Sequence, residues 1–287
     1  MAAVSVSNLQ KSYGSYEALR GIDFEIGAGE VFGLLGPNGA GKTTTVEILE
    51  GYRKRDAGVV EVLGEDPQRA DLEWRERIGI VLQSSSLYPN LSVAESLELF
   101  AGYYRRPLDV HRVIGLVGLE EKRDARVRTL SGGQSRRLDL GLGLIGDPEV
   151  LFLDEPTTGF DPAARRAAWE VIRSLRSLGK TILLTTHYLD EAENLSDRVA
   201  VLREGRIAAL GRPEDLTGSA PATEIRYRLN GREIVVSTHE PTRVLHELTT
   251  EALAEGRELE SLSVRRPTLE EIYLALTGSE VGEEPRK

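Results

Sequence analysis

A glycine-rich segment near the start of the chain has the composition of a loop that binds phosphate groups. Its residues are, in order, Gly36, Pro37, Asn38, Gly39, Ala40, Gly41, Lys42, Thr43 and Thr44. The segment follows a short apolar run, residues 31–35, which predicts a buried strand, and it opens a helical pattern. In that setting the glycines let backbone N–H groups approach phosphates, Lys42 reaches the β- and γ-phosphates, and the Thr43 hydroxyl can bind Mg²⁺. The alternative, a glycine-rich turn that holds a lysine by chance, is disfavoured by the order of strand, loop and helix.

Two adjacent carboxylates follow another apolar run. Asp154 and Glu155 come directly after residues 150–153, which predict a buried strand. Asp154 can hold the water shell of Mg²⁺ at the end of that strand, while Glu155, which points elsewhere, can polarise a water molecule. Alone, the pair would indicate only the start of a loop, but together with the glycine-rich segment it predicts a nucleoside triphosphatase. The sequence has no Asn-Lys-x-Asp element of the kind that recognises guanine, which favours ATP.

A pentapeptide between these two elements offers a second place where a phosphate could meet backbone N–H groups. It consists of Leu130, Ser131, Gly132, Gly133 and Gln134. Ser131 and Gln134 have the spacing of a capping box, which predicts that a helix begins here. A helix start with glycines and a serine hydroxyl also suits an incoming γ-phosphate, so the two interpretations are compatible.

Together these three elements resemble those of the nucleotide-binding subunits of the ATP-binding-cassette (ABC) superfamily, over about residues 4–216. The resemblance implies an α/β fold with a P-loop NTPase core of the ABC type and an α-helical subdomain. It implies ATP and Mg²⁺ as cofactors, with Thr43, Gln83 and Asp154 as metal ligands and Glu155 acting on the attacking water. It also implies that two subunits close head to tail, with each ATP between the glycine-rich loop of one and residues 130–134 of the other.

Four further positions take roles through this resemblance alone, since each is otherwise an ordinary core or surface residue. Tyr13 resembles the aromatic residue that stacks on adenine, although Tyr16 is close enough to compete for that role. Gln83 resembles the glutamine that senses Mg²⁺ and the γ-phosphate and borders the groove that contacts the permease. Asp161 resembles the residue of a loop that reaches the second subunit. His187 resembles the switch histidine that contacts the γ-phosphate and orients the attacking water.

Four apolar runs predict the buried strands of a sheet that is covered on both faces. They are residues 31–35, 78–82, 150–153 and 181–186. Residues of about 84–148 predict a helical subdomain, whose first helix begins at Ser92 with a capping box. Gly141 and Gly143 fall inside the helix that Ser131 begins, where each costs about 1 kcal/mol relative to alanine. They either loosen that helix or allow another element to pack closely against it.

A change of composition at residues 216–223 separates an expected ABC ATPase domain, residues 1–217, from a small C-terminal α+β domain, residues 222–280. A hairpin at residues 199–210 closes the first domain. The second domain is predicted to contain three strands, two helices and no chemical motif. The strands are 224–229, 233–237 and 258–264, and the helices are 242–254 and one that is capped by Thr268. We expect this domain to support dimer contact or regulation rather than chemistry.

The balance of charge restricts the possible partners. The 287 residues include 46 acidic and 36 basic side chains, a net charge of −10, and no cysteine. This balance argues against a general affinity for nucleic acid, and the lack of thiols excludes disulfides and fits a reducing compartment. The first residues lack the pattern of a signal peptide, and charges interrupt the most apolar stretch, residues 138–153, well short of the roughly 20 residues that cross a bilayer. We therefore expect a cytoplasmic protein that is held on the inner face of the cell membrane through its permease.

The expected function is that of the ATP-binding and ATP-hydrolysing subunit of an ABC exporter. It would power separate transmembrane permease subunits through ATP-driven dimerisation, with a homodimer expected and only indirect contact with the membrane. Residues 129–162 and 265–277 resemble the daunorubicin-resistance branch of ABC-2 multidrug exporters. The alternative is a soluble ABC ATPase that acts on a macromolecular partner, for which two cassettes or a long coiled-coil insertion would be expected. A regulatory module that binds ATP without turnover would lack Glu155 or His187.

Overall fold

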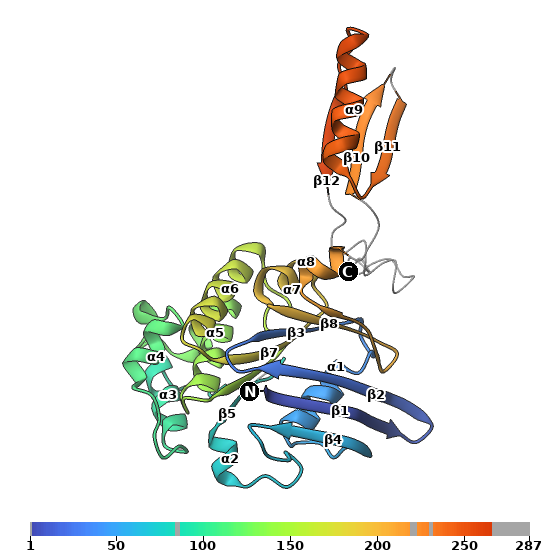
Figure 1. Ribbon diagram of the computed structural model, residues 1–287. Helices are drawn as coiled ribbons and strands as arrows, with labels where there is room; N and C mark the ends of the chain where they lie inside the picture. Colours follow the sequence, from blue (N-terminus) through green and yellow to red (C-terminus); the bar gives the residue numbers. More distant parts are fainter. Residues whose placement is uncertain (1, 84–86, 219–222, 230–231, 266–287) are drawn as a thin grey trace. The chain divides into compact units, whose positions relative to one another are not determined.

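The computed structural model describes residues 2–83, 87–218, 223–229 and 232–265 (Figure 1). The chain divides into two compact units, Met1–Leu210 and Gly211–Lys287, and each is described by itself. By this division helix α8 (Pro213–Gly218) belongs to the second unit, whereas the sequence placed residues up to 217 in the first domain. Within the described ranges, every helix is too short or too polar to cross a membrane.

A six-stranded sheet in the first unit positions the chemical motifs. In spatial order its strands are β5 (Ile78–Val81), β6 (Val150–Asp154), β7 (Thr181–Thr186), β3 (Val31–Leu35), β8 (Arg198–Arg203) and β9 (Arg206–Gly211). The first five run parallel, and β3, β6 and β7 are buried at every residue. The four strands predicted from apolar runs are confirmed, and so is the α/β class. Because the carboxyl ends of parallel strands meet at one edge, the glycine-rich loop after β3 lies near the carboxylates that end β6.

The predicted hairpin is formed by β8 and β9. A two-residue turn, Glu204 and Gly205, joins these neighbouring strands, and both residues have positive φ angles of 49° and 73°. Positive angles at both central positions are what the commonest two-residue hairpin turn requires, and glycine meets that requirement without strain.

A second sheet, which the sequence analysis did not predict, is antiparallel. Its order is β2 (Tyr16–Gly27), β1 (Ala2–Tyr13) and β4 (Ala57–Val62). Side chains on its inner face share a core with Phe32 of β3 and with Trp74 of the short helix α2 (Leu72–Glu76). Register shifts interrupt the pairing of β1 with β2, so the period of two that would mark these strands in the sequence is broken.

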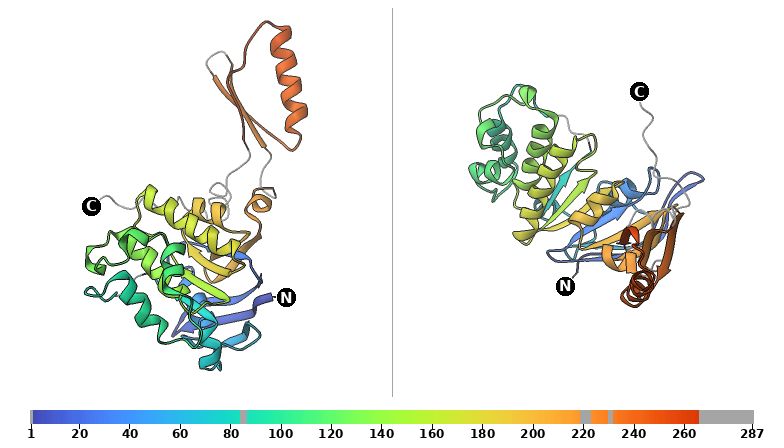
Figure 2. Two further views of the ribbon diagram at one scale, coloured as in Figure 1. Left: turned by 90° about the vertical axis from the view of Figure 1, so that its left-hand side faces the viewer. Right: turned by 90° about the horizontal axis from the view of Figure 1, so that it is seen from above.

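The predicted helical subdomain is built from α3 (Val93–Ala101), α4 (Val110–Leu116) and α5 (Gly132–Leu144), with short 3₁₀ turns at Glu120–Lys122 and Val127–Thr129. The views in Figures 1 and 2 agree that these helices lie together at one side of the first unit. Both predicted capping boxes are present, because Ser92 accepts the N–H of Glu95 at 3.1 Å and Ser131 accepts the N–H of Gln134 at 3.3 Å. Apolar side chains of all three helices form one core with the sheet.

The glycines of α5 allow close packing and do not loosen the helix. The helix is continuous from Gly132 to Leu144. A Cβ atom on Gly143 would lie 2.7 Å from Val81 Cγ2, and one on Gly79 of β5 would lie 2.2 Å from the Gly143 carbonyl oxygen. Contacts this short leave no room for side chains, so the backbones of α5 and β5 lie directly against each other.

Three other helices flank the motifs. They are α1 (Lys42–Leu49), α6 (Pro162–Ser177) and α7 (Leu189–Leu195). Asp161 caps α6 by accepting the N–H groups of Ala163 and Ala164, both at 2.8 Å, and a proline occupies the first turn. Trp169, Ile172 and Leu175 on the buried face of α6 join the core that contains the helical subdomain.

The second unit contains a three-stranded antiparallel sheet and the helix α9 (Pro241–Ala254), as predicted. Its central strand β10 (Thr223–Leu229) lies between β11 (Arg232–Thr238) and β12 (Glu260–Arg265), and α9 packs against β10. Ile225, Tyr227 and Ala252 are buried in this unit. The helix expected from Thr268 lies outside the described residues, as does most of the segment at 265–277.

Candidate active site

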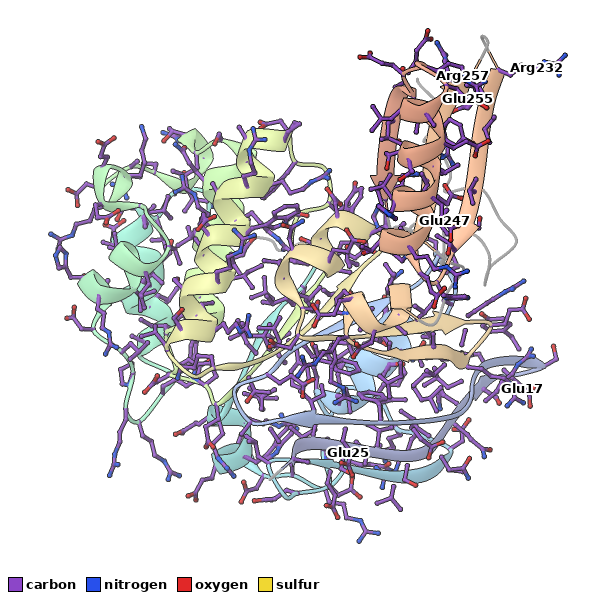
Figure 3. All side chains as sticks on the ribbon, turned by 45° about the horizontal axis from the view of Figure 1, so that its top comes forward. Glu17, Glu25, Arg232, Glu247, Glu255 and Arg257 are labelled. Carbon is purple, nitrogen blue, oxygen red and sulfur yellow. The ribbon has the colours of Figure 1, made fainter. Side chains whose placement is uncertain are left out.

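Buried carboxylates indicate where in the first unit to look for chemistry. Acidic side chains such as Glu17 and Glu25 of β2 extend into solvent (Figure 3). Among the described residues, the buried carboxylates are those of Glu50, Asp154, Glu155 and Glu191. Burying a charge is costly unless it has partners, so each of these positions needs an explanation.

A cavity of about 310 Å³ lies where the glycine-rich loop meets Glu155. It is lined by Tyr13, Tyr16, Ala18, Asn38, Gly39, Gly41, Lys42, Thr43, Thr44, Gln83 and Glu155. The predicted residues Gly36, Pro37 and Ala40 do not line it. The carbonyl groups of Gly36 and Pro37 accept from Lys42, and Ala40 is buried behind the loop.

The backbone of the loop adopts conformations that its glycines permit. Gly39 and Gly41 have φ angles of 81° and 109°, in the region where other residues are strained. A Cβ atom on Gly41 would also lie 2.7 Å from the carbonyl oxygen of Ala18. Gly41 precedes α1, whose first turn directs N–H groups without intrahelical acceptors toward the loop. These N–H groups and the positive end of the helix dipole suit the binding of phosphate.

Lys42 is held inside the loop. Its Nζ atom donates to the carbonyl oxygen of Gly36 at 2.8 Å and to that of Pro37 at 3.3 Å, and it lies 3.5 Å from Glu155 Oε1. Burial lowers the pKa of this ammonium, and the neighbouring carboxylates Glu155 and Asp154 oppose that change. The site therefore contains a cation whose nearest partners are a carboxylate and two neutral carbonyl groups.

Glu155 receives hydrogen bonds from several elements. Its Oε2 atom accepts from Gln83 Nε2 at 3.1 Å and from Thr158 Oγ1 at 3.0 Å, and it lies 3.3 Å from His187 Nδ1. The contact with His187, together with Lys42 and Thr158, lowers the pKa of this carboxyl to about 2 although burial acts in the opposite direction. Glu155 also has a φ angle of 45°, an uncommon conformation for a glutamate that structures maintain mainly at functional sites.

Asp154 shares one anchor with Glu155. The Thr185 hydroxyl on β7 donates to Asp154 Oδ1 at 2.5 Å and accepts the backbone N–H of Glu155 at 3.0 Å. Burial raises the pKa of Asp154, and the adjacent Glu155 raises it further. A single hydroxyl thus fixes both the predicted metal ligand Asp154 and the predicted catalytic residue Glu155 to the neighbouring strand.

Both tyrosines that were considered for base stacking line the cavity. Tyr13 and Tyr16 pair across the turn between β1 and β2, and their rings are 40% and 53% exposed. The Tyr16 hydroxyl donates to the carbonyl oxygen of Gly39 at 2.8 Å, and that of Tyr13 lies 3.4 Å from Thr44 Oγ1. Arg53 lies over the Tyr13 ring, 5.2 Å from its centroid. Either ring could stack on a base.

Other predicted residues also lie outside the lining of the cavity, namely Asp154 and His187 beside Glu155, residues 130–134 and Asp161. Residues 130–134 lead into α5, where the exposed Ser131 is the N-cap and the half-buried Gln134 completes the capping box. Asp161 is the exposed N-cap of α6. Neither element lines the cavity around Lys42.

Sequence reasoning missed the residues that fix this geometry, namely Thr158, Thr185 and Arg136. The two threonines carry no distinctive pattern. Arg136 could have been noticed, because it occupies the same helical face as Leu140 and Gly143 and so places an arginine at a buried position of α5. Its guanidinium donates to the backbone carbonyl groups of residues 154–156.

The residues present fit ATP with Mg²⁺. The loop supplies open N–H groups and a lysine for phosphates. Mg²⁺ is commonly held by one or two protein oxygens together with phosphates and waters, and Thr43, Gln83 and Asp154 could provide such a partial set. The described residues include no group of three or more histidines, cysteines or acidic residues that could hold a metal without the nucleotide.

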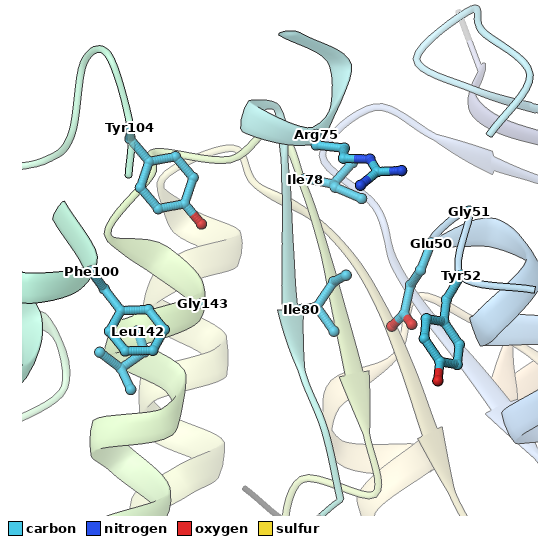
Figure 4. A pocket seen from close by; sticks show the side chains of 10 residues that line it. All are labelled: Glu50, Gly51, Tyr52, Arg75, Ile78, Ile80, Phe100, Tyr104, Leu142 and Gly143. Carbon is cyan, nitrogen blue, oxygen red and sulfur yellow. The ribbon is translucent and has the colours of Figure 1, made fainter. Parts of the chain in front are cut away.

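A second hollow of about 480 Å³ lies beside β5, between α5 and the end of α1 (Figure 4). It is lined by Glu50, Gly51, Tyr52, Arg75, Ile78, Ile80, Phe100, Tyr104, Leu142 and Gly143. Burial raises the pKa of the Glu50 carboxyl to about 8, and the nearby charges of Asp154 and Glu47 add to this effect. No hydrogen bond or ion pair from the described part of the chain satisfies that carboxyl.

Comparison with known proteins gives consistent similarities. The family model described as "ABC transporter" matches residues 19–158. The Nod factor export ATP-binding protein I of Ralstonia nicotianae is 38% identical over 97% of this chain and 94% of its own length. The protein of the same name from Rhizobium meliloti is 39% identical over 97% of this chain and 89% of its own length.

Two solved structures extend the similarity to the fold. CbiO1 from Clostridium perfringens, described as part of the ABC transporter complex cbiONQ, is 29% identical, with a TM-score of 0.69 over 76% of this chain and 91% of that one. A dimeric ATP-binding cassette in a post-hydrolysis state, bound to ADP and Pi, is 25% identical, with a TM-score of 0.65 over 73% of this chain and 98% of that one.

Proposed function

This chain belongs to the ABC transporter family as an ATP-binding subunit, and we propose that it drives an exporter by closing with a second copy of itself around two ATP molecules. It is an ATPase that uses ATP and Mg²⁺ and is coupled to transport. It dimerises with another cassette and works with a transmembrane permease as part of a transporter complex. The identity of the second cassette, the direction of transport and the roles of individual residues belong to the proposal.

The proposal rests on the observation that the predicted residues of one chain surround only part of the cavity. Lys42, Gln83 and Glu155 line it and His187 adjoins Glu155, so one side of a nucleotide would be well contacted. Ser131, whose helix start also suits a γ-phosphate, is exposed and lies elsewhere. A head-to-tail pair would bring the Ser131 of one copy to the cavity of the other. In such a pair Glu155 acts on water, His187 orients that water, and Asp161 contacts the second subunit.

Export is supported by the relatives that match nearly the whole chain, since their names describe export ATP-binding proteins. The names specify Nod factor, so a multidrug substrate of the daunorubicin-resistance type stays a prediction. The same full-length similarity disfavours the soluble non-transport ATPase that was the alternative.

The hollow beside β5 is the surface that we assign to the permease. It combines apolar and aromatic side chains from the helical subdomain with those of β5, and Ile80 and Tyr52 are 39% and 79% exposed (Figure 4). Exposed apolar groups around a hollow are typical of a protein interface. Docking there would hold the subunit at the inner face of the membrane through the permease.

The test separates binding from hydrolysis. Glu155→Gln preserves the shape of the side chain but removes its basic oxygen, so the rate of ATP hydrolysis should fall by about 10²- to 10⁴-fold while ATP still binds. Light scattering with Mg²⁺ and ATP should then detect a lasting dimer, and adding Ser131→Arg should abolish it. A Glu155→Gln protein that hydrolyses ATP at the wild-type rate would contradict the role of Glu155.

A further inference from the structure

We propose that Arg136 is a positioning residue that sets the backbone of Glu155 and of the segment that leads to Gln83. Its guanidinium extends from α5 to the ends of two strands. Nε donates to the carbonyl oxygen of Pro156 at 3.0 Å, and Nη2 donates to those of Asp154 at 3.0 Å and Glu155 at 3.3 Å. Nη1 donates to the carbonyl oxygen of Leu82, which shares its peptide plane with Gln83.

The burial of the Arg136 guanidinium is costly, which indicates that its role is to position the backbone. The Arg136 side chain is 8% exposed, and burial lowers its pKa. An acidic group, Asp139, lies 3.9 Å from Nη1, beyond hydrogen-bond distance, while all the short contacts are with neutral carbonyl groups. A buried guanidinium that bonds neutral acceptors gains less than one in a close ion pair. What the fork of five fixed donors provides is simultaneous orientation of several peptide planes.

Glu155 needs that orientation. Its φ angle of 45° is costly and persists only when the surroundings hold the backbone on both sides. Thr185 holds the N–H of Glu155, and Arg136 holds the carbonyl groups of residues 154–156. The direction of the carboxylate toward the cavity is therefore set jointly by β7 and α5.

The position of Arg136 on α5 gives this contact a second consequence. The same helix begins at Ser131, so the segment proposed to meet the partner's ATP and the loop that carries this subunit's own base are joined through one side chain. A shift of α5 when the second ATP arrives would move the backbone of Glu155. This consequence rests on the proposed dimer, whereas the positioning role concerns a single chain.

Arg136→Met, which removes all five donors, and Arg136→Lys, which keeps the charge, test the inference in the full chain. A misplacement of about 1 Å in a catalytic group can cost about 10²-fold, so kcat should fall by about 10- to 100-fold in Arg136→Met, with a smaller loss in Arg136→Lys. The dissociation constant for a fluorescent ATP analogue should stay within about threefold, because the loop and Lys42 are untouched.

A matched control is the next residue, Arg137, which donates from the same helix to the carbonyl oxygens of Gly118 at 2.7 Å and Val117 at 3.4 Å. Arg137→Gln also removes guanidinium bonds to backbone carbonyl groups, two where Arg136 makes four, and its kcat should remain near that of the wild type. Equal losses of kcat in Arg137→Gln and Arg136→Met would overturn the positioning role. So would parallel losses of ATP affinity and kcat in Arg136→Lys, which serves if Arg136→Met does not fold.

A double-mutant cycle identifies the group through which Arg136 acts. If it acts through Glu155, then Arg136→Met should not slow a Glu155→Gln protein further, because residues that work as a unit are not additive. A full additional loss in the double variant would refute the inference. If Glu155→Gln alone leaves the rate unchanged, the proposed function fails on its own account, and a drop in kcat from Arg136→Met would then report on the backbone at Gln83.

Discussion

Two buried glutamates in the first unit have opposite electrostatic surroundings. Glu155 accepts bonds from Gln83 and Thr158 and lies near Lys42 and His187, and its pKa is lowered to about 2. Burial raises the pKa of Glu50 to about 8 without any compensating partner from the described residues. The difference shows that the cavity at Glu155 is preorganised within one chain. The hollow at Glu50 has no such partners within the described residues, and we propose that another protein completes it.

The largest expected effect comes from removing Lys42, the cation that lies beside Glu155 in the cavity. Lys42→Ala should lower ATPase activity by about 10²-fold or more, because it removes the ammonium aimed at the β- and γ-phosphates. Activity with Mg²⁺ and ATP should be measured beside circular dichroism, which should report an intact fold. Unchanged turnover would remove the assignment of the cavity.

A smaller effect is expected from the hydroxyl that anchors both carboxylates. Thr185→Val leaves the Glu155 N–H and Asp154 Oδ1 without this partner, a loss that should reduce kcat by about tenfold. Thr181→Val is the control on the same strand, because its hydroxyl accepts the N–H of Gly29 far from the carboxylates. If both variants lose the same fraction of kcat, the Thr185 hydroxyl has no specific role in holding the two carboxylates.

The raised pKa of Glu50 predicts how the free energy of unfolding depends on pH. Between about pH 4.5 and 8 the folded state keeps a proton on Glu50 that the unfolded state has lost, so this group lowers the free energy of unfolding as pH rises through that window. Glu50→Gln, which stays neutral, should be more stable than the wild type near pH 8 by on the order of 4 kcal/mol, and the difference should vanish below about pH 4.5. Urea unfolding at a series of pH values measures this difference.

Glu170→Gln is the control for Glu50, because Glu170 is exposed, is paired with Arg173 at 2.7 Å and is not among the charges that raise the pKa of Glu50. A difference between Glu50→Gln and the wild type that does not change with pH would mean that Glu50 is ionised in the folded protein. The surroundings of Glu50 would then already stabilise its charged form, and the contrast with Glu155 would disappear.

The smallest effect on ATP is expected from truncation after residue 218. The second unit contains none of the residues that line the cavity, so affinity for ATP should change by no more than about twofold. Dimer assembly or coupled transport should fall, since we propose that this unit serves contact or regulation. A truncated protein that folds but cannot bind ATP would contradict this division of roles.

Local patterns in the sequence predicted much of this structure. The apolar runs before Gly36 and Asp154 are strands, and the capping boxes at Ser92 and Ser131 begin helices. These features depend on residues that are close together in the sequence, so they can be predicted without knowledge of the fold. The sheet of β1, β2 and β4 was missed because bulges interrupt its alternation and because β4 joins β1 only after α1 intervenes.

The residues of the site likewise fall into those that could be predicted from the sequence and those that could not. The loop around Lys42 and the pair of carboxylates could be recognised because each motif is contiguous. The contacts of Arg136 and Thr185 could not, because they join α5 and β7 to the end of β6 through tertiary packing. The sequence likewise left open whether Gly143 weakens α5, and only the backbone of β5 against it decided the matter.

The contact between Lys42 and Glu155 also sets the order in which the site becomes reactive. His187 first, and then Lys42, whose Nζ lies 3.5 Å from Glu155 Oε1, lower the pKa of this carboxyl to about 2 in the chain without nucleotide. A triphosphate that drew the ammonium toward itself would weaken the part of this effect that is due to Lys42. On the proposed role of Glu155 as the base, an idle subunit would therefore keep that base weak through His187 and Lys42.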